Sequence, residues 1–326
     1  MRVLVTGGAG FIGTHLTRRL LAEGHAVTVL DNEFNSRRES VPAGARFVFG
    51  DVVRPGDLEP VFAGGLDAVC HLAGQVSIIR SFDDPVADLR TNVEGTVNIL
   101  QMCLRYKVPR LVYASSMTAY GNGGAVPTPE SEPCRPDSYY GITKHAAERY
   151  VHATAERPDL KFDFRATSLR MFSVFGPGQA LDNPYQGVLG IFIGKLMRRE
   201  GITIFGDGEQ TRDFVFIDDI VDGWLKALNS PAAGGGIFNL GSGRSLSINK
   251  LAEHVIAAFG HAPGSYPIAY APARPGEQRR VQADVRRARD VLGWQPRTSF
   301  AAGLAETIRQ GRESELLTVS AAGGGA

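Results

Sequence analysis

The most informative stretch of this chain is Thr6-Gly7-Gly8-Ala9-Gly10-Phe11-Ile12-Gly13. It follows an apolar run at residues 2–5, which predicts a buried strand, and it opens a pattern of apolar residues at helical spacing over residues 11–23. A second apolar run at residues 26–30 then ends in Asp31. A strand, a glycine turn, a helix and a strand within about 30 residues predict a βαβ unit.

The glycines in this stretch suit the binding of a dinucleotide. Gly7 permits a tight turn, Gly10 lets the backbone approach a pyrophosphate, and Gly13 allows close packing of the helix. The free N–H groups at the start of the helix then face the phosphates. A plain turn is the alternative, but it does not account for the glycines as well as the dinucleotide does.

The acid at the end of the second strand indicates which dinucleotide binds. The Asp31 carboxylate can accept hydrogen bonds from both ribose hydroxyls, and it would repel the 2′-phosphate of NADP. The sequence therefore favours NAD, although Arg37 and Arg38 lie nearby and could weaken that preference.

Strand and helix patterns continue to alternate beyond this unit, which predicts an α/β fold with a doubly wound, Rossmann-type parallel sheet. The further strands are expected at residues 47–49, 68–72, 110–114 and 167–171, and the helices at 88–106 and 143–155. After about Gly176 glycine, proline and asparagine become frequent, and we expect a smaller mixed lobe on the sheet's C-terminal edge. Its expected elements are strands at 202–205 and 236–240 and helices at 217–229 and 248–260.

Composition and charge exclude several classes of function. The net charge is +1, so neither nucleic acid nor an anionic membrane surface is an expected partner. Cys70, Cys103 and Cys134 are too scattered for a disulfide framework or a metal site, which favours a reducing compartment. No signal peptide or membrane-spanning pattern is present, so a cytoplasmic protein is expected.

A second group of residues points to proton transfer. Tyr140 and Lys144 are four residues apart, so on a helix their side chains share a face, and Ser116 follows the strand at 110–114. A nearby ammonium lowers the pKa of a phenol, and such a tyrosine can take a proton from a sugar hydroxyl while NAD takes the hydride. By itself the tyrosine–lysine spacing favours a surface tyrosine beside a solvated lysine, and the catalytic interpretation depends on the other motifs.

These motifs occur together and in order. The glycine turn, Leu72-Ala73-Gly74, Asn92, the Ser116 loop and Tyr140-Gly141-Ile142-Thr143-Lys144 follow one another at suitable spacing. In this combination the chain resembles the extended short-chain dehydrogenase/reductase family, in its nucleotide-sugar epimerase/dehydratase branch. It is most similar to the UDP-hexose and UDP-glucuronate 4-epimerases. The resemblance runs from Met1 to about Ile308.

The resemblance implies roles for individual residues. Ser116, Tyr140 and Lys144 match the family's catalytic residues. The implied NAD contacts are Gly7, Gly10, Phe11, Ile12, Gly13, Asp31, Asn32, Asn35, Ser36, Asp51, Val52, Leu72, Ala73, Asn92, Ser115, Tyr140 and Lys144. Residues 1–175 then form the NAD-binding domain that carries the catalytic residues. Residues 176–319 form mainly the nucleotide-sugar lobe, and residues 320–326 form a flexible tail.

The same resemblance implies a UDP-sugar as substrate. Arg212 lies in a segment similar to the family's diphosphate-binding segment, and Arg274-Pro275-Gly276-Glu277 matches a signature in which the arginine binds phosphate and the acid holds the ribose. Arginine forks complement phosphate oxygens. The alternative for either arginine is a surface charge on a loop.

Two positions beside the catalytic serine bear on the reaction. Dehydratases of this branch carry an Asp-Glu pair there and decarboxylating relatives carry a Glu, whereas this chain has Met117 and Thr118. Inversion of C4 through a transient 4-keto sugar is therefore expected. A dehydratase with unusual loop residues and a non-catalytic NAD-binding sensor are the rival functions.

The choice of sugar depends on fewer residues. Ser173 stands where many hexose epimerases carry Asn and where relatives acting on UDP-glucuronic acid tend to carry Thr. Arg80 with the hydroxyls of Ser115, Ser116 and Thr118 could form a cradle for a sugar carboxylate, although Arg80 could equally be a rim or diphosphate residue. Conversion of UDP-glucuronic acid to UDP-galacturonic acid thus leads narrowly over a UDP-glucose/UDP-galactose epimerase.

The expected partner in solution is a second copy of the chain. Relatives pair through the helix that follows Asp88 and the helix around Tyr140, which form a four-helix bundle. Residues 92–106 carry apolar residues on more than one face, and this pattern fits either a homodimer or packing on the chain's own sheet.

Overall fold

A seven-stranded parallel sheet forms the centre of the molecule, as the alternating pattern predicts. The computed structural model describes residues 1–181, 187–274 and 277–323, with only the backbone described for 314–323. In spatial order the strands are β11 (Ile237–Leu240), β6 (Arg165–Met171), β5 (Arg110–Ser116), β4 (Ala68–His71), β1 (Arg2–Thr6), β2 (Ala26–Asp31) and β3 (Arg46–Phe49). The order changes direction at β1, so the crevice for a ligand opens beside the glycine turn.

Helices cover both faces of this sheet, and alternate strand residues pack against each layer. In β1, Val3 and Val5 belong to the same core as Leu16 of α1, whereas Leu4 belongs to the core of Phe62. This alternation explains why β1 is apolar throughout. One layer contains α1 (Phe11–Ala22) and α8 (Ile217–Asn229), and the other contains α2 (Pro55–Ala63), α5 (Gly95–Arg105) and α6 (Tyr139–Ala155).

The helix expected at residues 88–106 contains a π-helical turn in the structure. Helix α3 (Ile78–Asp83) is followed by α4 (Pro85–Leu89), a π-helical turn at Arg90–Glu94, and α5. The wider turn contains Asn92, whose side chain is almost fully buried. Turns of this kind inside helices often mark functional sites.

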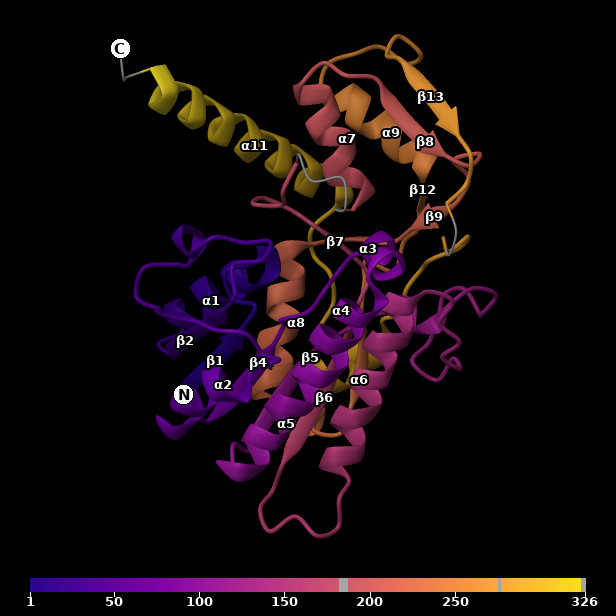
Figure 1. The fold of residues 1–326 in the computed structure, drawn as a ribbon. Helices are drawn as coiled ribbons and strands as arrows, with labels where there is room; N and C mark the ends of the chain where they lie inside the picture. The colour runs from indigo at the N-terminus through magenta and orange to yellow at the C-terminus, as the bar shows by residue number, and fades with distance from the viewer. Residues whose placement is uncertain (182–186, 275–276, 324–326) are drawn as a thin grey trace.

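The second lobe lies at the C-terminal edge of the sheet (Figure 1). It contains short strand pairs, in which β8 pairs with β13, β9 with β12, and β7 with β10. Its elements are β7 (Ser173–Phe175), α7 (Val188–Met197), β8 (Ile202–Phe205), β9 (Thr211–Arg212), β10 (Phe214–Phe216), β12 (Leu246–Ser247), α9 (Ile248–Ala258), β13 (Ile268–Ala271) and α11 (Phe300–Gly323). Figure 1 shows α11 extending away from the body of the molecule.

Three elements within residues 176–319, which were expected to form mainly the nucleotide-sugar lobe, belong to the first lobe. Helix α8 and strand β11 lie within residues 176–319, but α8 packs on the central sheet and β11 pairs in parallel with β6. The chain therefore passes into the second lobe, returns to complete the sheet, and leaves again. Helix α10 (Arg286–Leu292) packs beside β11 and α8 in the first lobe.

The C-terminus and the question of membrane spans complete the description. Helix α11 continues to Gly323, so residues 320–323 of the expected tail are helical, and residues 324–326 lie outside the described residues. Within the part of the chain that the structure describes, no helix is long and apolar enough to cross a bilayer.

Candidate active site

The glycine turn fits the pyrophosphate of a dinucleotide closely. Gly7 has a φ of +68°, and a Cβ atom there would lie 2.7 Å from the backbone nitrogen of Ala73. A Cβ atom on Gly13 would lie 2.3 Å from the carbonyl oxygen of Gly7. Gly10 is the N-cap of α1 and offers no side chain to the helix N–H groups, which leaves them for phosphate oxygens. The residues present therefore fit NAD at this turn.

The Asp31 carboxylate is held in place by its own loop. It lies at the end of β2 and accepts hydrogen bonds from the Ala9 N–H at 3.0 Å, from the Glu33 N–H at 2.9 Å and from the Ser36 hydroxyl at 2.8 Å. The last two bonds join the strand end to the loop that follows it. The guanidinium of Arg38 lies 5.6 Å from the centre of the Phe47 ring, so this arginine packs along β3.

Other residues expected to contact NAD also come together. The Asn32 amide donates to Asp51 at 2.9 Å, and the carbonyl oxygen of the buried Val52 accepts a hydrogen bond from the amide of Asn98 on α5. Leu72 and Ala73 follow β4, and the Ala73 N–H donates to Thr6 at 3.2 Å. That bond places them directly against the glycine turn.

Ser116, Tyr140 and Lys144 meet where β5 ends and α6 begins. Ser138 caps α6 by accepting a hydrogen bond from the Gly141 N–H at 3.1 Å, which fixes the first turn that carries Tyr140. The Ser116 hydroxyl accepts a hydrogen bond from the Thr118 hydroxyl at 2.9 Å. It also forms a hydrogen bond with the Tyr140 phenol. The structure thus brings Ser116 and Tyr140 into contact.

The electrostatics of this group differ from the sequence-based expectation. Burial raises the pKa of the Tyr140 phenol to about 12, the Ser116 hydrogen bond lowers it, and the Asp88 carboxylate raises it. Burial lowers the pKa of Lys144 to about 8, while Asp88 and Glu148 raise it. The raised Tyr140 pKa in the protein alone is opposite in direction to the decrease that a neighbouring ammonium would produce, because burial is the largest influence on this phenol. An oxidised nicotinamide ring would bring a further positive charge here.

A buried polar cluster joins Lys144 to the π-helical turn. The carboxylate of Asp88 accepts hydrogen bonds from Thr143 at 2.6 Å, from Gln75 at 2.7 Å and from Asn92 at 3.1 Å. Gly74 lies beside this cluster, since a Cβ atom there would be 2.8 Å from Asn92 Oδ1 and 3.7 Å from Lys144 Nζ. Asp88 was not among the site residues expected from the sequence, because nothing in its local pattern separates it from a surface helix acid.

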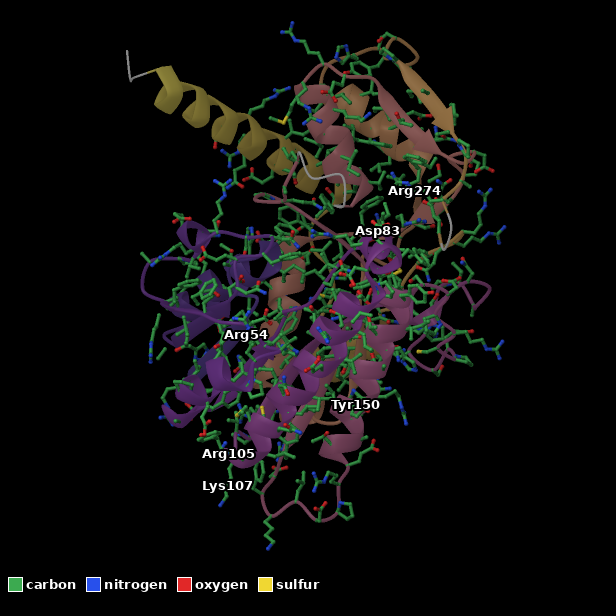
Figure 2. All side chains as sticks on the ribbon, in the orientation of Figure 1. Arg54, Asp83, Arg105, Lys107, Tyr150 and Arg274 are labelled. Atoms are coloured by element: carbon green, nitrogen blue, oxygen red, sulfur yellow. The ribbon has the colours of Figure 1, made fainter. Side chains whose placement is uncertain are left out.

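The second lobe brings the expected nucleotide residues together. Arg212 forms an ion pair with Glu277 at 2.9 Å, and the guanidinium of Arg274 lies 3.7 Å from the centre of the Phe205 ring. Burial lowers the pKa of both arginines, and the Glu277 carboxylate raises it. Pro275 and Gly276 lie outside the described residues. Figure 2 shows Arg274 on the second lobe.

Hydrogen bonds join the segment that follows Glu277 to the loop that follows Ser116. The Gln278 amide donates to the Gly121 carbonyl at 2.6 Å, and the Arg279 N–H donates to the Asn122 side chain at 2.9 Å. The loop that follows Ser116 and the segment around Arg279 are therefore in contact where the two lobes meet. The sequence carried no signal for Asn122 or Gln278 as links.

Comparison with known proteins agrees with this geometry. The model of the NAD dependent epimerase/dehydratase family matches residues 3–241. The chain belongs to this family. A UDP-glucose 4-epimerase of Mycolicibacterium smegmatis is 39% identical over 317 residues, covering 94% of this chain and 97% of that protein. The match confirms the predicted resemblance and the dependence on NAD.

Solved structures of family members show the same fold. A UDP-glucose 4-epimerase from Thermotoga maritima, crystallised with UDP-glucose, has a TM-score of 0.91 at 34% identity, covering 97% of this chain and 100% of that chain. MoeE5, solved in complex with UDP-glucuronic acid and NAD, has a TM-score of 0.86 at 34% identity, covering 96% of this chain and 100% of that chain.

Within this epimerase/dehydratase chain, the carboxylate cradle expected from the sequence is not assembled. The Ser115 hydroxyl donates to Glu148 at 2.7 Å, and Arg80 donates to Asn35 at 3.1 Å. Ser116 and Thr118 lie together, but Arg80 contacts the loop after Asp31 on the cofactor side. The two side chains that would complete the cradle thus have other partners.

Ser173 lies on β7 at the junction of the lobes, where its N–H donates to the Asp213 carbonyl at 2.9 Å. It is half-buried, and β7 continues directly from β6 of the sheet. Metal ligands are absent from the site as far as the structure describes it, since no cluster of His, Cys, Asp and Glu side chains forms there.

Proposed function

We propose that this protein is a UDP-sugar 4-epimerase that inverts C4 through a transient 4-keto sugar. The observation that carries the proposal is the group of Ser116, Tyr140 and Lys144, which has Met117 and Thr118 beside it instead of a carboxylate. Without an acid or base at Met117 and Thr118, the site can remove and return the proton of the C4 hydroxyl, but these two positions supply no second group for loss of water. UDP-glucose 4-epimerases among the relatives support the same reaction.

The residues divide the work between them. Tyr140 takes the proton from the sugar's 4-hydroxyl and returns it after the ring has turned, and Ser116 donates a hydrogen bond to the same oxygen. Lys144 keeps a positive charge beside them. NAD, when bound, supplies the acceptor and donor of the C4 hydride. Arg212 and Arg274 hold the diphosphate while the sugar is free to rotate.

A neutral hexose is the sugar that the geometry supports best. Ser115 and Arg80 are engaged with Glu148 and Asn35, so a carboxylate on C6 would find fewer partners than the sequence suggested. We therefore place UDP-glucose/UDP-galactose first. UDP-glucuronic acid remains the second candidate because Ser173 replaces the asparagine of many hexose epimerases and because MoeE5 was solved with that sugar nucleotide.

The test separates these sugars directly. The purified protein with NAD is incubated with UDP-glucose and, in a second tube, with UDP-glucuronic acid, and the anomeric proton is followed by NMR. New galactose signals in the first tube alone support the neutral-hexose assignment. Galacturonate signals in the second tube alone transfer the assignment to the uronic acid. The absence of a C4 epimer in both tubes contradicts the proposal.

We further propose that the enzyme is a homodimer. Apolar side chains are exposed along α3, α4 and α6, and they are Phe82, Val86, Leu89, Tyr139, Ile142 and Tyr150. The apolar residues of α5, such as Ile99 and Cys103, pack instead in the chain's own core. Exposed apolar side chains grouped on neighbouring helices are typical of a protein interface. Figure 1 shows these helices on one side of the molecule.

A further inference from the structure

Arg80 connects two loops that are far apart in the sequence. It lies on α3, and its guanidinium donates to the side-chain oxygen of Asn35 at 3.1 Å. The same guanidinium lies 4.6 Å from the centre of the Phe34 ring, which is 65% exposed. A planar guanidinium can stack on an aromatic face and donate from its edge at once. We call these three side chains the clasp.

Both ends of the clasp are anchored. On one side, Ser36 follows Asn35 and donates to Asp31 at 2.8 Å, which fixes the clasp to the residue expected to hold the adenosine ribose. On the other side, Ser77 caps α3 by accepting the Arg80 N–H at 3.2 Å, and Gln75 donates to Asp88 at 2.7 Å. The clasp therefore links the ribose loop to the buried cluster beside Lys144.

The position of the clasp relative to the sheet gives it a role. The loop of Phe34 and Asn35 follows β2, and the segment leading to Arg80 follows β4, while β1 with the glycine turn lies between these two strands. A dinucleotide whose pyrophosphate rests on the glycine turn enters the crevice between the two loops. A contact that joins the loops spans the mouth of that crevice.

We propose that the clasp of Phe34, Asn35 and Arg80 closes the cofactor crevice and holds NAD in the protein between turnovers. Arg80 acts as a positioning residue through the ribose loop. Epimerisation gives this retention a purpose, because the hydride removed from C4 must come back to the same sugar before the cofactor leaves. The inference goes beyond the proposed function, since it concerns cofactor release and holds for either sugar.

The experiment measures NAD release without any sugar. Protein loaded with isotope-labelled NAD is diluted into a large excess of unlabelled NAD, and the label that stays bound is followed by rapid gel filtration. Arg80→Ala, Phe34→Leu and the double variant are compared with the wild type. Asn35 is left unchanged because its amide is itself an expected NAD contact. Arg105→Ala is the control, since Arg105 pairs with Glu59 at the far end of α5 (Figure 2).

We expect each single variant to release NAD about five- to tenfold faster, given the strength of an exposed stacking contact and one hydrogen bond. The double variant should release it no faster than the quicker single variant, because both changes open the same contact. Arg105→Ala should match the wild type. Arg80→Lys keeps the charge but loses the planar fork, so it should also release NAD faster, and it decides the test if Arg80→Ala does not fold.

Two results would overturn the proposal. Unchanged release in Arg80→Ala, or in Arg80→Lys where the alanine variant does not fold, would show that the crevice is not closed by this contact. Effects of Arg80→Ala and Phe34→Leu that multiply in the double variant would show that Arg80 acts on NAD by itself. Neither result bears on C4 epimerisation, which the NMR test measures separately.

Discussion

In the proposed reaction Tyr140 has to lose and regain its proton, and its burial opposes the loss. Burial raises its pKa to about 12, so the phenol keeps its proton in the protein alone near neutral pH. Tyr140→Phe removes the only atom of this side chain that can carry the proton while leaving the ring in place. We expect turnover to fall at least about 10²-fold, with NAD still bound at the wild-type stoichiometry.

The measurement combines an NMR assay of C4 inversion with a count of bound NAD after gel filtration. Full activity in Tyr140→Phe would contradict the assignment of this residue. Loss of activity with NAD still bound would support a chemical role for Tyr140. Loss of both activity and NAD would instead show that the side chain is needed to hold the cofactor.

Asp88 sets the charge around the same tyrosine. Its carboxylate raises the pKa of both Lys144 and Tyr140. Lys144, with a pKa of about 8, is charged below that pH and loses its charge above it. Asp88→Asn removes the anion, so the Lys144 pKa falls further, and we expect the alkaline decline of kcat to begin at lower pH than in the wild type.

The control for this prediction is Thr143→Val. It deletes the 2.6 Å hydrogen bond to Asp88 but leaves every charge in place. We expect it to lower kcat without moving the midpoint of the alkaline decline. An unmoved profile in Asp88→Asn, measured as kcat against pH, would mean that Asp88 acts only through its hydrogen bonds.

At the scale of residues, the sequence predicted which groups would react but not their pKa values. Ser116, Tyr140 and Lys144 occupy spacings that define them in the linear chain. The pKa values depend on burial and on neighbouring charges. Both come from residues distant in sequence, such as Asp88, which raises the pKa of Tyr140 and of Lys144. The contact of Arg80 with Asn35 could not be predicted for the same reason, because the two residues lie 45 positions apart in the sequence.

At the scale of elements, one buried ion pair joins α6 to β6. Arg170 on β6 contacts Glu148 on α6 at 2.5 Å, and both side chains are almost fully buried. Burial raises the pKa of Glu148, but hydrogen bonds from His145 and Arg170 more than offset this and bring it to about 2. The helix that carries Tyr140 is thereby fixed to the strand next to Ser115, which also donates to Glu148.

Loss of one partner should therefore cost more than loss of both. Arg170→Met leaves a buried carboxylate without its cation, and we expect the free energy of unfolding to fall by about 3–5 kcal/mol in a denaturant titration. The double variant Glu148→Leu/Arg170→Met should recover most of that loss. Equal destabilisation in the single and double variants would mean that packing, rather than the unpaired charge, dominates.

The same pair gives stability a defined dependence on pH. The pKa of Glu148 in the folded protein lies below its ordinary value of 4.5, so the contribution is fully present above that pH. It is lost as the pH falls from there toward about 2. In the double variant, the free energy of unfolding should depend less on pH across this interval than in the wild type.

Element boundaries could be predicted where the pattern is local and not where tertiary contacts decide. The apolar periodicity predicted the ends of α1 and β2 to within one residue. It predicted one helix at 88–106, whereas the chain forms α4, a π-helical turn and α5. The turn places Asn92 where it can bond Gln75, Asp88 and Thr143, and two of these partners, Gln75 and Thr143, lie outside the predicted helix.

At the scale of the whole molecule, the exposed apolar side chains of α3, α4 and α6 allow a test of the proposed dimer. Tyr150 on α6 is 52% exposed and can be changed without touching the site (Figure 2). If the chain is a dimer through this face, Tyr150→Glu should shift it toward the monomer in light scattering, because the interface would bury unpaired charge. Arg54→Glu, an exposed change at the start of α2, serves as the control.

The outcome is read from the molar mass at equal protein concentration. A wild-type monomer would contradict the dimer, and a Tyr150→Glu dimer would move the interface elsewhere. The sequence alone could not choose between dimer and self-packing for residues 92–106, because both bury the same apolar side chains. The structure shows that α5 faces the sheet and that its apolar residues pack in the chain's own core.

The repeated passage of the chain between the lobes limits how such enzymes can be re-engineered. The second lobe is assembled from separate stretches, β7 to β10, β12 to β13, and α11, with α8, β11 and α10 of the first lobe interposed. A recombination event at a single point cannot exchange one lobe for that of a relative. Substrate range in this architecture should therefore change by substitutions within loops, and a designed chimaera would need several junctions that each preserve the sheet.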